Sequence, residues 1–182
     1  SSVLSYLEQK KVGHQIPQFY LWLKLLMEVD KGTTSVWYPW LQSLPSTFTN
    51  AIAMDDVEME CLPPFAWSLA KMQKLHLRYF REALHYLMED TLVSETVRND
   101  LEVTKWAFNV VFTRAWWKEG STEDQRTDIV PVGDMFNHKH PDNVYIQHDD
   151  EDNCNVLLQN DTLAGSPLTL TYGLETNPYR FM

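Results

Sequence analysis

Residues 129–138 read IVPVGDMFNH, and residues 164–173 read AGSPLTLTYG. Each stretch joins an apolar, β-branched run to polar residues at its end, which is typical of a short strand that leads into a turn or a site. Either string alone is too short to identify a chemistry. Together they give the last third of the chain a β-rich character that the first two-thirds lack.

The chain before these stretches reads as helices. Pro17 opens a run with apolar residues at helical spacing, and Gly32 stands where a C-cap glycine belongs. The chain contains seven Trp, and we expect such large rings to fill the contacts between helices. The other segments predicted in this part are a loop at 37–45 and helices at about 55–61, 65–90 and 101–117.

From Glu119 to Asp128 the sequence becomes polar and loop-like. The acidic run 148–153 lacks the Gly and the terminal Glu of a calcium-binding EF-hand loop, so we interpret it as a solvated hairpin turn. The expected fold class is α+β, with a helical block over 1–127 and a β-rich block over 128–182. The predicted strands are 129–132, 144–147, 156–159 and 168–172, with a further turn at 165–167.

The bulk composition limits the partners of the chain. Net charge is −10 and the Lys and Arg residues form no visible cluster, so we expect no direct contact with nucleic acid. A Lys- or Arg-rich protein or peptide suits this field, because opposite charge speeds encounter. Two cysteines form no disulfide framework, and no apolar run is long enough for a membrane span. These features predict an intracellular, monomeric protein, with the compartment undetermined.

Arg114 stands out on the predicted helix 101–117. On a helical wheel it falls inside the apolar stripe that includes Val110 and Val111. A buried guanidinium is costly unless an anion pairs with it. The partner is either internal, such as Asp134, or the carboxylate of a ligand, and spacing alone leaves both interpretations open.

Other site classes receive no support from spacing. The metal-ligand types in the last third have no tight pair spacing on one element, so no metal site is predicted. The sequence also has no Gly-x-Ser-x-Gly elbow and no Gly-rich phosphate loop. The ligand types considered are Asp134, His138, His140, His148 and Cys154.

The two opening stretches resemble, in this order, two segments of SET-domain protein methyltransferases. The first resembles the segment that ends in Asn-His, and the second resembles the segment that ends in Tyr-Gly. Residues 19–45 resemble the helical insertion that splits the SET domain in the Rubisco large-subunit lysine methyltransferase and its animal relatives. The resemblance therefore implies a helical SET insertion over 1–127 and an incomplete C-terminal SET segment over 128–182.

This resemblance implies a protein-lysine N-methyltransferase that uses S-adenosylmethionine. Arg114, Asn137 and His138 would contact that cofactor, Arg114 at its amino-acid end. Tyr172 would be the catalytic tyrosine at the methyl-transfer channel. Without the resemblance, Tyr172 is more simply a core aromatic at a strand end, and Asn137-His138 a turn-forming pair.

Three further positions bear on the substrate. Histidine-methylating relatives have a bulky Trp before the Asp-Met pair, where this chain has Gly133, followed by Asp134. Trp116 matches an aromatic position of lysine-methylating relatives, and an aromatic wall suits an extended alkyl amine. We therefore expect a lysine acceptor in a protein substrate; histidine is the alternative, and a non-catalytic SET-like interaction module is the rival from another class.

Several features of the family pattern are missing from this sequence. The Gly-x-Gly turn that lies against the cofactor, the closing Tyr-Gly-Phe segment and the helical substrate-binding lobe are all absent. Pro178 and Tyr179 replace a common Ala-Glu pair. We therefore expect this chain to hold half of a methyl-transfer site, either because it is part of a longer protein or because the protein is a degenerate member of the family.

Overall fold

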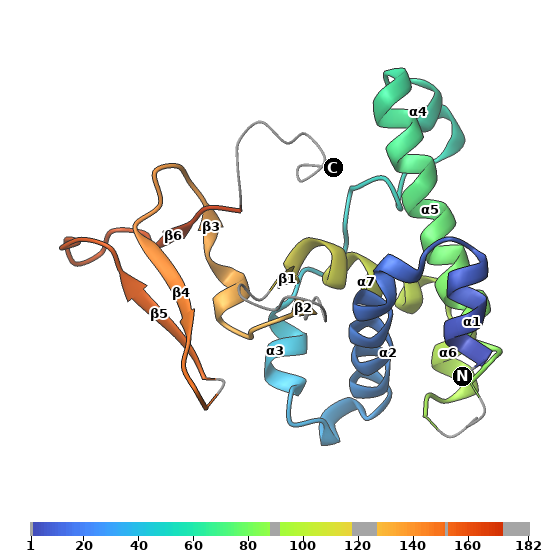
Figure 1. The fold of residues 1–182 in the computed structure, drawn as a ribbon, viewed down its shortest axis with the longest axis horizontal. Coiled ribbons are helices and arrows are strands. Elements are labelled where there is room, and N and C mark those ends of the chain that lie inside the picture. Colours follow the sequence, from blue (N-terminus) through green and yellow to red (C-terminus); the bar gives the residue numbers. More distant parts are fainter. Residues whose placement is uncertain (1, 88–91, 118–126, 152, 173–182) are drawn as a thin grey trace. The chain divides into compact units, whose positions relative to one another are not determined.

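The computed structural model describes residues 2–87, 92–117, 127–151 and 153–172 (Figure 1). These residues pack as two compact units, one that ends at Asp128 and one that begins at Ile129. The first unit is helical with one short strand pair, and the second consists of short strands and turns. The chain thus has the expected α+β fold, while the assignment of 1–127 and 128–182 to parts of a SET domain stays a prediction.

The core of the first unit is aromatic. Phe80 lies between Phe19 and Phe108, with ring centroids 5.2 and 5.6 Å away. Trp22 is fully buried and donates its indole N–H to the carbonyl of Thr104 at 3.1 Å. Large rings therefore do fill these helix contacts. The helices are α1 (Ser2–Gln9), α2 (Ile16–Asp30), α3 (Tyr38–Ser43), α4 (Asp56–Glu60), α5 (Pro64–Leu84), α6 (Glu95–Asn99) and α7 (Leu101–Arg114), with 3-10 turns η1 (Gly13–Gln15) and η2 (Gly32–Thr34).

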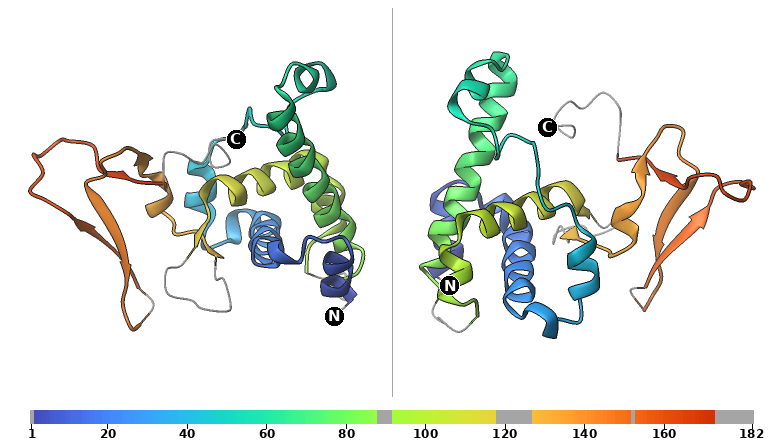
Figure 2. Two further views of the ribbon diagram at one scale, coloured as in Figure 1. Left: turned by 45° about the horizontal axis from the view of Figure 1, so that its top comes forward. Right: turned by 180° about the vertical axis from the view of Figure 1, so that it is seen from behind.

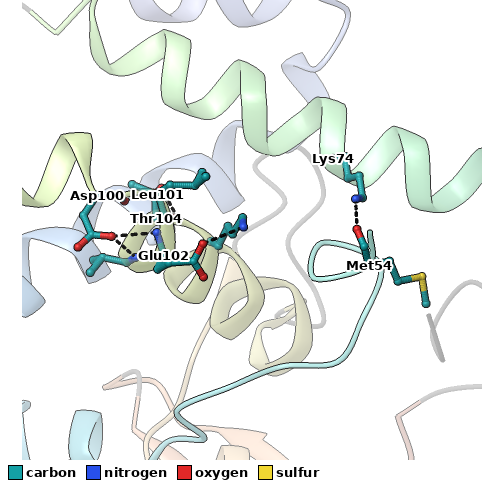
Figure 3. Close-up of polar contacts among 8 residues, drawn as sticks. Met54, Lys74, Asp100, Leu101, Glu102 and Thr104 are labelled. Atoms are coloured by element: carbon teal, nitrogen blue, oxygen red, sulfur yellow. Dashed lines mark hydrogen bonds and ion pairs between the residues drawn. The ribbon is translucent and has the colours of Figure 1, made fainter. Parts of the chain in front are cut away.

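Local side-chain chemistry fixes where α7 begins. The carboxylate of Asp100 accepts hydrogen bonds from the backbone N–H groups of Glu102 and Val103 at 2.9 and 3.1 Å (Figure 3). These donors have no partner inside the helix, so the cap stabilises the first turn. Asp100 thereby sets the start of the helix that ends at Arg114.

A small satellite cluster holds α4 against the first turns of α5. Ala51, Met59 and Ala70 are buried together there. Lys74 of α5 donates to the backbone carbonyl of Met54 (Figure 3). Both views in Figure 2 show α4 and the start of α5 extending beyond the other helices of this unit.

The second unit is built on a hairpin and a parallel strand pair. In the hairpin, β4 and β5 run antiparallel with Val144 opposite Leu158 and His148 opposite Cys154. Strands β3 and β6 pair in parallel. Its elements are η3 (Gly133–Met135), β3 (Asn137–His138), β4 (Val144–His148), β5 (Cys154–Leu158) and β6 (Thr169–Leu170); β1 (Trp116–Trp117) and β2 (Thr127–Asp128) pair in the first unit.

Several predicted elements are confirmed. The helix from Pro17 is α2, and Gly32 follows it with φ +54°. The acidic run forms the β4–β5 turn, where the Asp149 carboxylate accepts from the backbone N–H of Asn153 at 2.8 Å. Gly165, with φ +86°, lies in the predicted turn before β6.

Other predictions of secondary structure were wrong. The predicted loop 37–45 contains helix α3, which Pro39 is able to begin because proline suits the first helical turn. The predicted helix 101–117 ends at Arg114, since Ala115 is extended and Trp116–Trp117 pair with β2. The predicted helix 65–90 ends as α5 at Leu84; residues 88–91 lie outside the described residues, as do 118–126 of the predicted polar loop.

The predicted strand 129–132 is a turn instead. Val132 has φ +75° and ψ −45°, which no strand residue adopts. The backbone N–H groups of Asp134 and Met135 donate to the carbonyls of Val130 and Val132. The apolar run is therefore used to turn the chain into η3 rather than to extend a sheet.

Candidate functional site

The parallel pairing of β3 and β6 brings the two opening motifs together. Asn137 lies opposite Thr169, and His138 lies opposite Leu170. Beyond the pair, the backbone N–H of Lys139 donates to the carbonyl of Leu170 at 3.1 Å. The chain thus leaves β6 and reaches Tyr172 beside the Asn-His motif.

Tyr172 forms hydrogen bonds to the segment of the Asn-His motif through both its backbone N–H and its hydroxyl. Its backbone N–H donates to Nδ1 of His138 at 3.0 Å, and its hydroxyl donates to the carbonyl of Phe136 at 2.6 Å. The rings of His138 and Tyr172 lie 5.2 Å apart. Since Nδ1 accepts, a neutral His138 carries its proton on Nε2. Tyr172 is 45% exposed, so it is a surface residue of the described chain rather than the core aromatic of the simpler interpretation.

Asn143 holds the backbone of β6 in place. Its side-chain carbonyl accepts from the backbone N–H of Thr169 at 2.8 Å, and its amide donates to the carbonyl of Pro167 at 3.0 Å. Sequence reasoning missed both Asn143 and the Phe136 carbonyl. Asn143 follows Pro141-Asp142 in a turn-rich segment, which is a weak signal for this kind of backbone bonding.

The Gly133-Asp134 pair follows a strained residue. A β-branched residue such as Val132 rarely adopts a positive φ, and this conformation costs about 1–3 kcal/mol. Such strain is concentrated at functional sites, where the surrounding structure maintains it. Gly133 is buried and Asp134 is half-buried at the start of η3. The strained turn therefore marks this segment as part of the candidate site.

Arg114 and Trp116 belong to the first unit and lie at the end of α7 and in β1. Arg114 is the last residue of α7 and half-buried, with its Nε atom shielded from solvent. Its face of the helix also carries the buried Ala107 and Val111, so the helical wheel placed it correctly. The choice between Asp134 and a ligand carboxylate as its partner stays a prediction.

Two polar atoms beside Arg114 are shielded without a hydrogen bond among the described residues. They are Nε1 of Trp116 and Oγ1 of Thr127. Trp116–Trp117 and Thr127–Asp128 form the strand pair β1–β2, so both atoms come from one two-stranded ribbon. A buried polar atom without a partner costs about 1–3 kcal/mol. A polar ligand at the end of α7 would supply these missing partners.

Two other kinds of site were also sought. Within the described ranges, no three His, Cys, Asp or Glu side chains gather in a way that would hold a metal ion. None of the described helices combines the length and apolar character of a membrane span. Cys61 is exposed and Cys154 is half-buried, and the structure shows no disulfide between them.

Comparison with known proteins gives a distant relationship. No family model matches the sequence. Among curated proteins, it is similar to the actin-histidine N-methyltransferases of Mus musculus and Rattus norvegicus, each 24% identical over 151 residues. The similarity covers 79% of this chain and 25% of each relative. The chain thus spans about a quarter of the length of the curated relatives it matches, and its similarity to protein methyltransferases extends over both units.

Proposed function

We propose that this chain is part of an S-adenosylmethionine-dependent protein methyltransferase of the SET type. The observation that carries the proposal is the bonding of Tyr172 to His138 and to the carbonyl of Phe136. The pairing of β3 with β6 brings together a tyrosine and an Asn-His motif that lie far apart in the sequence. The distant similarity to curated protein methyltransferases supports the same class.

We place the chain in the branch that resembles the Rubisco large-subunit lysine methyltransferase. In this proposal residues 1–127 are the helical SET insertion and residues 128–182 are a C-terminal SET segment. The order of a helical unit followed by a β-rich unit supports this division. The remaining parts of the site would come from sequence outside this chain.

The residues present fit the chemistry of the cofactor. Arg114 is a cation for its carboxylate, and the backbone and amide groups of Asn137 and His138 offer donors and acceptors. The shielded polar atoms of Trp116 and Thr127 agree with a polar ligand near the end of α7. S-adenosylmethionine, when bound, supplies the methyl group.

Tyr172 would orient the acceptor nitrogen. A phenol that donates its proton to a carbonyl keeps lone pairs on oxygen, and the donation makes that oxygen a better acceptor. An N–H of the substrate can then bond to Tyr172, which aligns the nitrogen lone pair for attack. Fixing this orientation lowers the barrier because the reacting groups meet in a productive geometry. A lysine ammonium must first lose a proton to water or to a base, since the charged form has no lone pair.

Lysine is the acceptor that we propose first. Gly133 leaves out the bulky side chain that histidine-methylating relatives place before the Asp-Met pair, and Trp116 provides an aromatic wall near Arg114. Asp134 is the third residue that we propose for substrate binding. Histidine is the second candidate because the curated relatives are named as actin-histidine methyltransferases.

A methyl-transfer assay with matched peptides tests the proposal. Basic peptides that differ only in one acceptor, Lys, His or Ala, are incubated with labelled S-adenosylmethionine and the longer protein that would supply the remaining parts of the site. We expect label in the Lys peptide alone. Label in the His peptide alone would show that the acceptor is histidine and not lysine. Absence of transfer, together with no calorimetric binding of S-adenosylmethionine, would favour the non-catalytic interaction module.

A further inference from the structure

A basic surface forms where α1 packs against α5 in the first unit (Figure 1). The whole chain has 25 Asp and Glu residues against 15 Lys and Arg residues. Residues 2–15 and 64–84, which contain α1 and α5, reverse this balance, with six Lys or Arg residues and two Glu residues. The sequence shows no such cluster because the two segments lie far apart in it, and folding brings their cations together.

Tyr79 of α5 contacts a cation from each of these two segments. The ammonium of Lys10, which follows α1, lies 5.4 Å from the centre of the Tyr79 ring, and the guanidinium of Arg78 lies 5.3 Å from the same centre. Lys10 also lies 5.3 Å from the centre of the Tyr6 ring. Cation–π attraction to these rings fixes the positions of both charges. Two like charges are thereby held beside one ring, where they repel each other and attract an anion.

Lys71 and Lys74 extend this surface along α5. Together with Arg78 they are three, four and seven residues apart, which places all three on one face of the helix. The ammonium of Lys71 lies 4.6 Å from the centre of the Trp67 ring. Lys74 donates to a backbone carbonyl, a neutral group that leaves its charge in place. The surface is thus a row of three cations on α5 beside Lys10.

The carboxylate of Glu82 neutralises part of this surface. It lies 3.6 Å from Nε of Arg78 and also accepts a hydrogen bond from the hydroxyl of Tyr6. The side chain of Arg78 nevertheless remains 61% exposed. Lys10 and Lys71 are exposed, and within the described part of the chain they contact aromatic rings and form no ion pair. Because the tyrosine shares Glu82 with Arg78, the surface keeps a positive charge.

We propose that this basic surface, defined by Lys10, Lys71, Lys74 and Arg78, binds an acidic segment of a partner protein. Asp or Glu side chains three, four or seven residues apart on a helix repeat at the same intervals as the α5 cations. The acidic remainder of the chain repels an extended polyanion, such as a nucleic acid or an anionic membrane, that reaches beyond the surface. A short acidic segment covers the cations alone. The surface lies in the helical unit and does not depend on the proposed methyl transfer.

Fluorescence anisotropy with a labelled, alanine-rich peptide that carries Glu at every third or fourth position tests the surface. We expect the intact chain to bind this peptide, more weakly as salt is added, and not to bind the same peptide with Gln in place of Glu. Lys10→Gln and Arg78→Gln should each weaken binding about two- to fivefold, the effect of losing one exposed ion pair. Lys105→Gln is the matched control, because it changes the net charge equally at a residue of α7 that pairs with Glu102; it should bind as the unaltered chain does.

Tyr79→Leu separates an ordered surface from a diffuse positive field. It changes no charge but removes the ring that fixes Lys10 and Arg78, so binding should weaken about twofold or more. Circular dichroism checks folding, and the two exposed cation variants keep the test decisive if Tyr79→Leu does not fold.

Four results would overturn the proposal. The first is no binding of the Glu peptide at submillimolar protein. The second is an equal loss of binding in Lys105→Gln and in the variants of Lys10 and Arg78. The third is unchanged binding by a folded Tyr79→Leu variant. The fourth is tighter binding of a single-stranded oligonucleotide of equal charge, or of anionic vesicles, which would assign the surface to a nucleic acid or a membrane instead.

Discussion

At the scale of single residues, the hydroxyl of Tyr172 is the group on which the proposed chemistry most depends. Tyr172→Phe removes the hydrogen bond to the Phe136 carbonyl, and with it the oxygen that we propose as acceptor for the substrate N–H. We expect methyl transfer to fall on the order of 100-fold, the scale of a misplaced reacting group. The free energy of unfolding should change by about 1 kcal/mol or less, because the lost hydrogen bond is partly exposed.

Tyr145→Phe is the matched control for that variant. Tyr145 is an equally exposed tyrosine in β4, and it is not part of the Asn-His contacts. Initial rates of methyl transfer should be unchanged in this variant. Full activity in Tyr172→Phe would refute the catalytic role of the hydroxyl.

The buried His76 should make the folding stability of the chain sensitive to acid. Burial, with a smaller contribution from the neighbouring His14, lowers the pKa of His76 to about 4. Its Nδ1 lies 2.8 Å from Nε2 of Gln15. The unfolded chain therefore takes up a proton first, so the stability that His76 provides is present above about pH 6.5 and is lost as pH falls towards 4.

Chemical denaturation between pH 7.5 and 4 measures this effect. The unaltered chain should lose roughly 2–3 kcal/mol more than His76→Gln over that range, since each pKa unit corresponds to 1.36 kcal/mol. The Gln side chain keeps a hydrogen-bonding partner for Gln15 and has no titrating proton. Parallel pH profiles for the two proteins would contradict the role of His76.

The site residues could be proposed from the sequence only in part. The helical wheel pointed to Arg114, whereas Asn137, His138 and Tyr172 came from the family resemblance, and the functional roles of all four stay proposals. Two contacts were not predicted: the Phe136 carbonyl accepts from the Tyr172 hydroxyl, and the Asn143 side chain accepts from the backbone N–H of Thr169 in β6. Any residue type offers a backbone carbonyl, so the sequence carries no signal for the first of these contacts.

At the scale of elements, the cap of α7 offers a direct test of what positions Arg114. Asp100→Ala leaves the N–H groups of Glu102 and Val103 without their acceptor. We expect a loss of about 1 kcal/mol in the free energy of unfolding. Asp100→Asn keeps a side-chain oxygen at the same position and should lose only a few tenths of a kcal/mol. Equal losses in urea denaturation would mean that the carboxylate charge, rather than the hydrogen bonds, stabilises this helix.

Whether a helix or strand could be predicted from the sequence depends on whether residues close together in the sequence determine it. The long helices α2, α5 and α7 were predicted because apolar residues at helical spacing indicate a buried face over several turns. The strands at 116–117 and 137–138 were not, because two-residue strands exist only through partners far away in sequence. The turn at Val132 was missed since β-branched residues rarely adopt a positive φ.

At the scale of the whole molecule, the burial of apolar side chains differs between the two units. Of the buried apolar residues in the described part of the chain, Val144 belongs to the second unit and all others belong to the first. Tyr145 and Leu157 face each other across the β4–β5 hairpin and remain 44% and 37% exposed. A two-stranded hairpin with so little buried surface is only marginally stable in water.

Native-state hydrogen exchange on the intact chain should therefore separate the two units. Amides in the middle of α2 and α7 open through loss of the aromatic core, whereas those of β4 and β5 need only local opening of the hairpin. We expect exchange at least about 100-fold faster in β4 and β5, which corresponds to about 3 kcal/mol less opening free energy. Phe80→Ala should accelerate exchange in the helices and leave the hairpin rates unchanged. If both regions exchange at the same rate, the two units unfold as one cooperative body and the hairpin is stabilised by more than its own contacts.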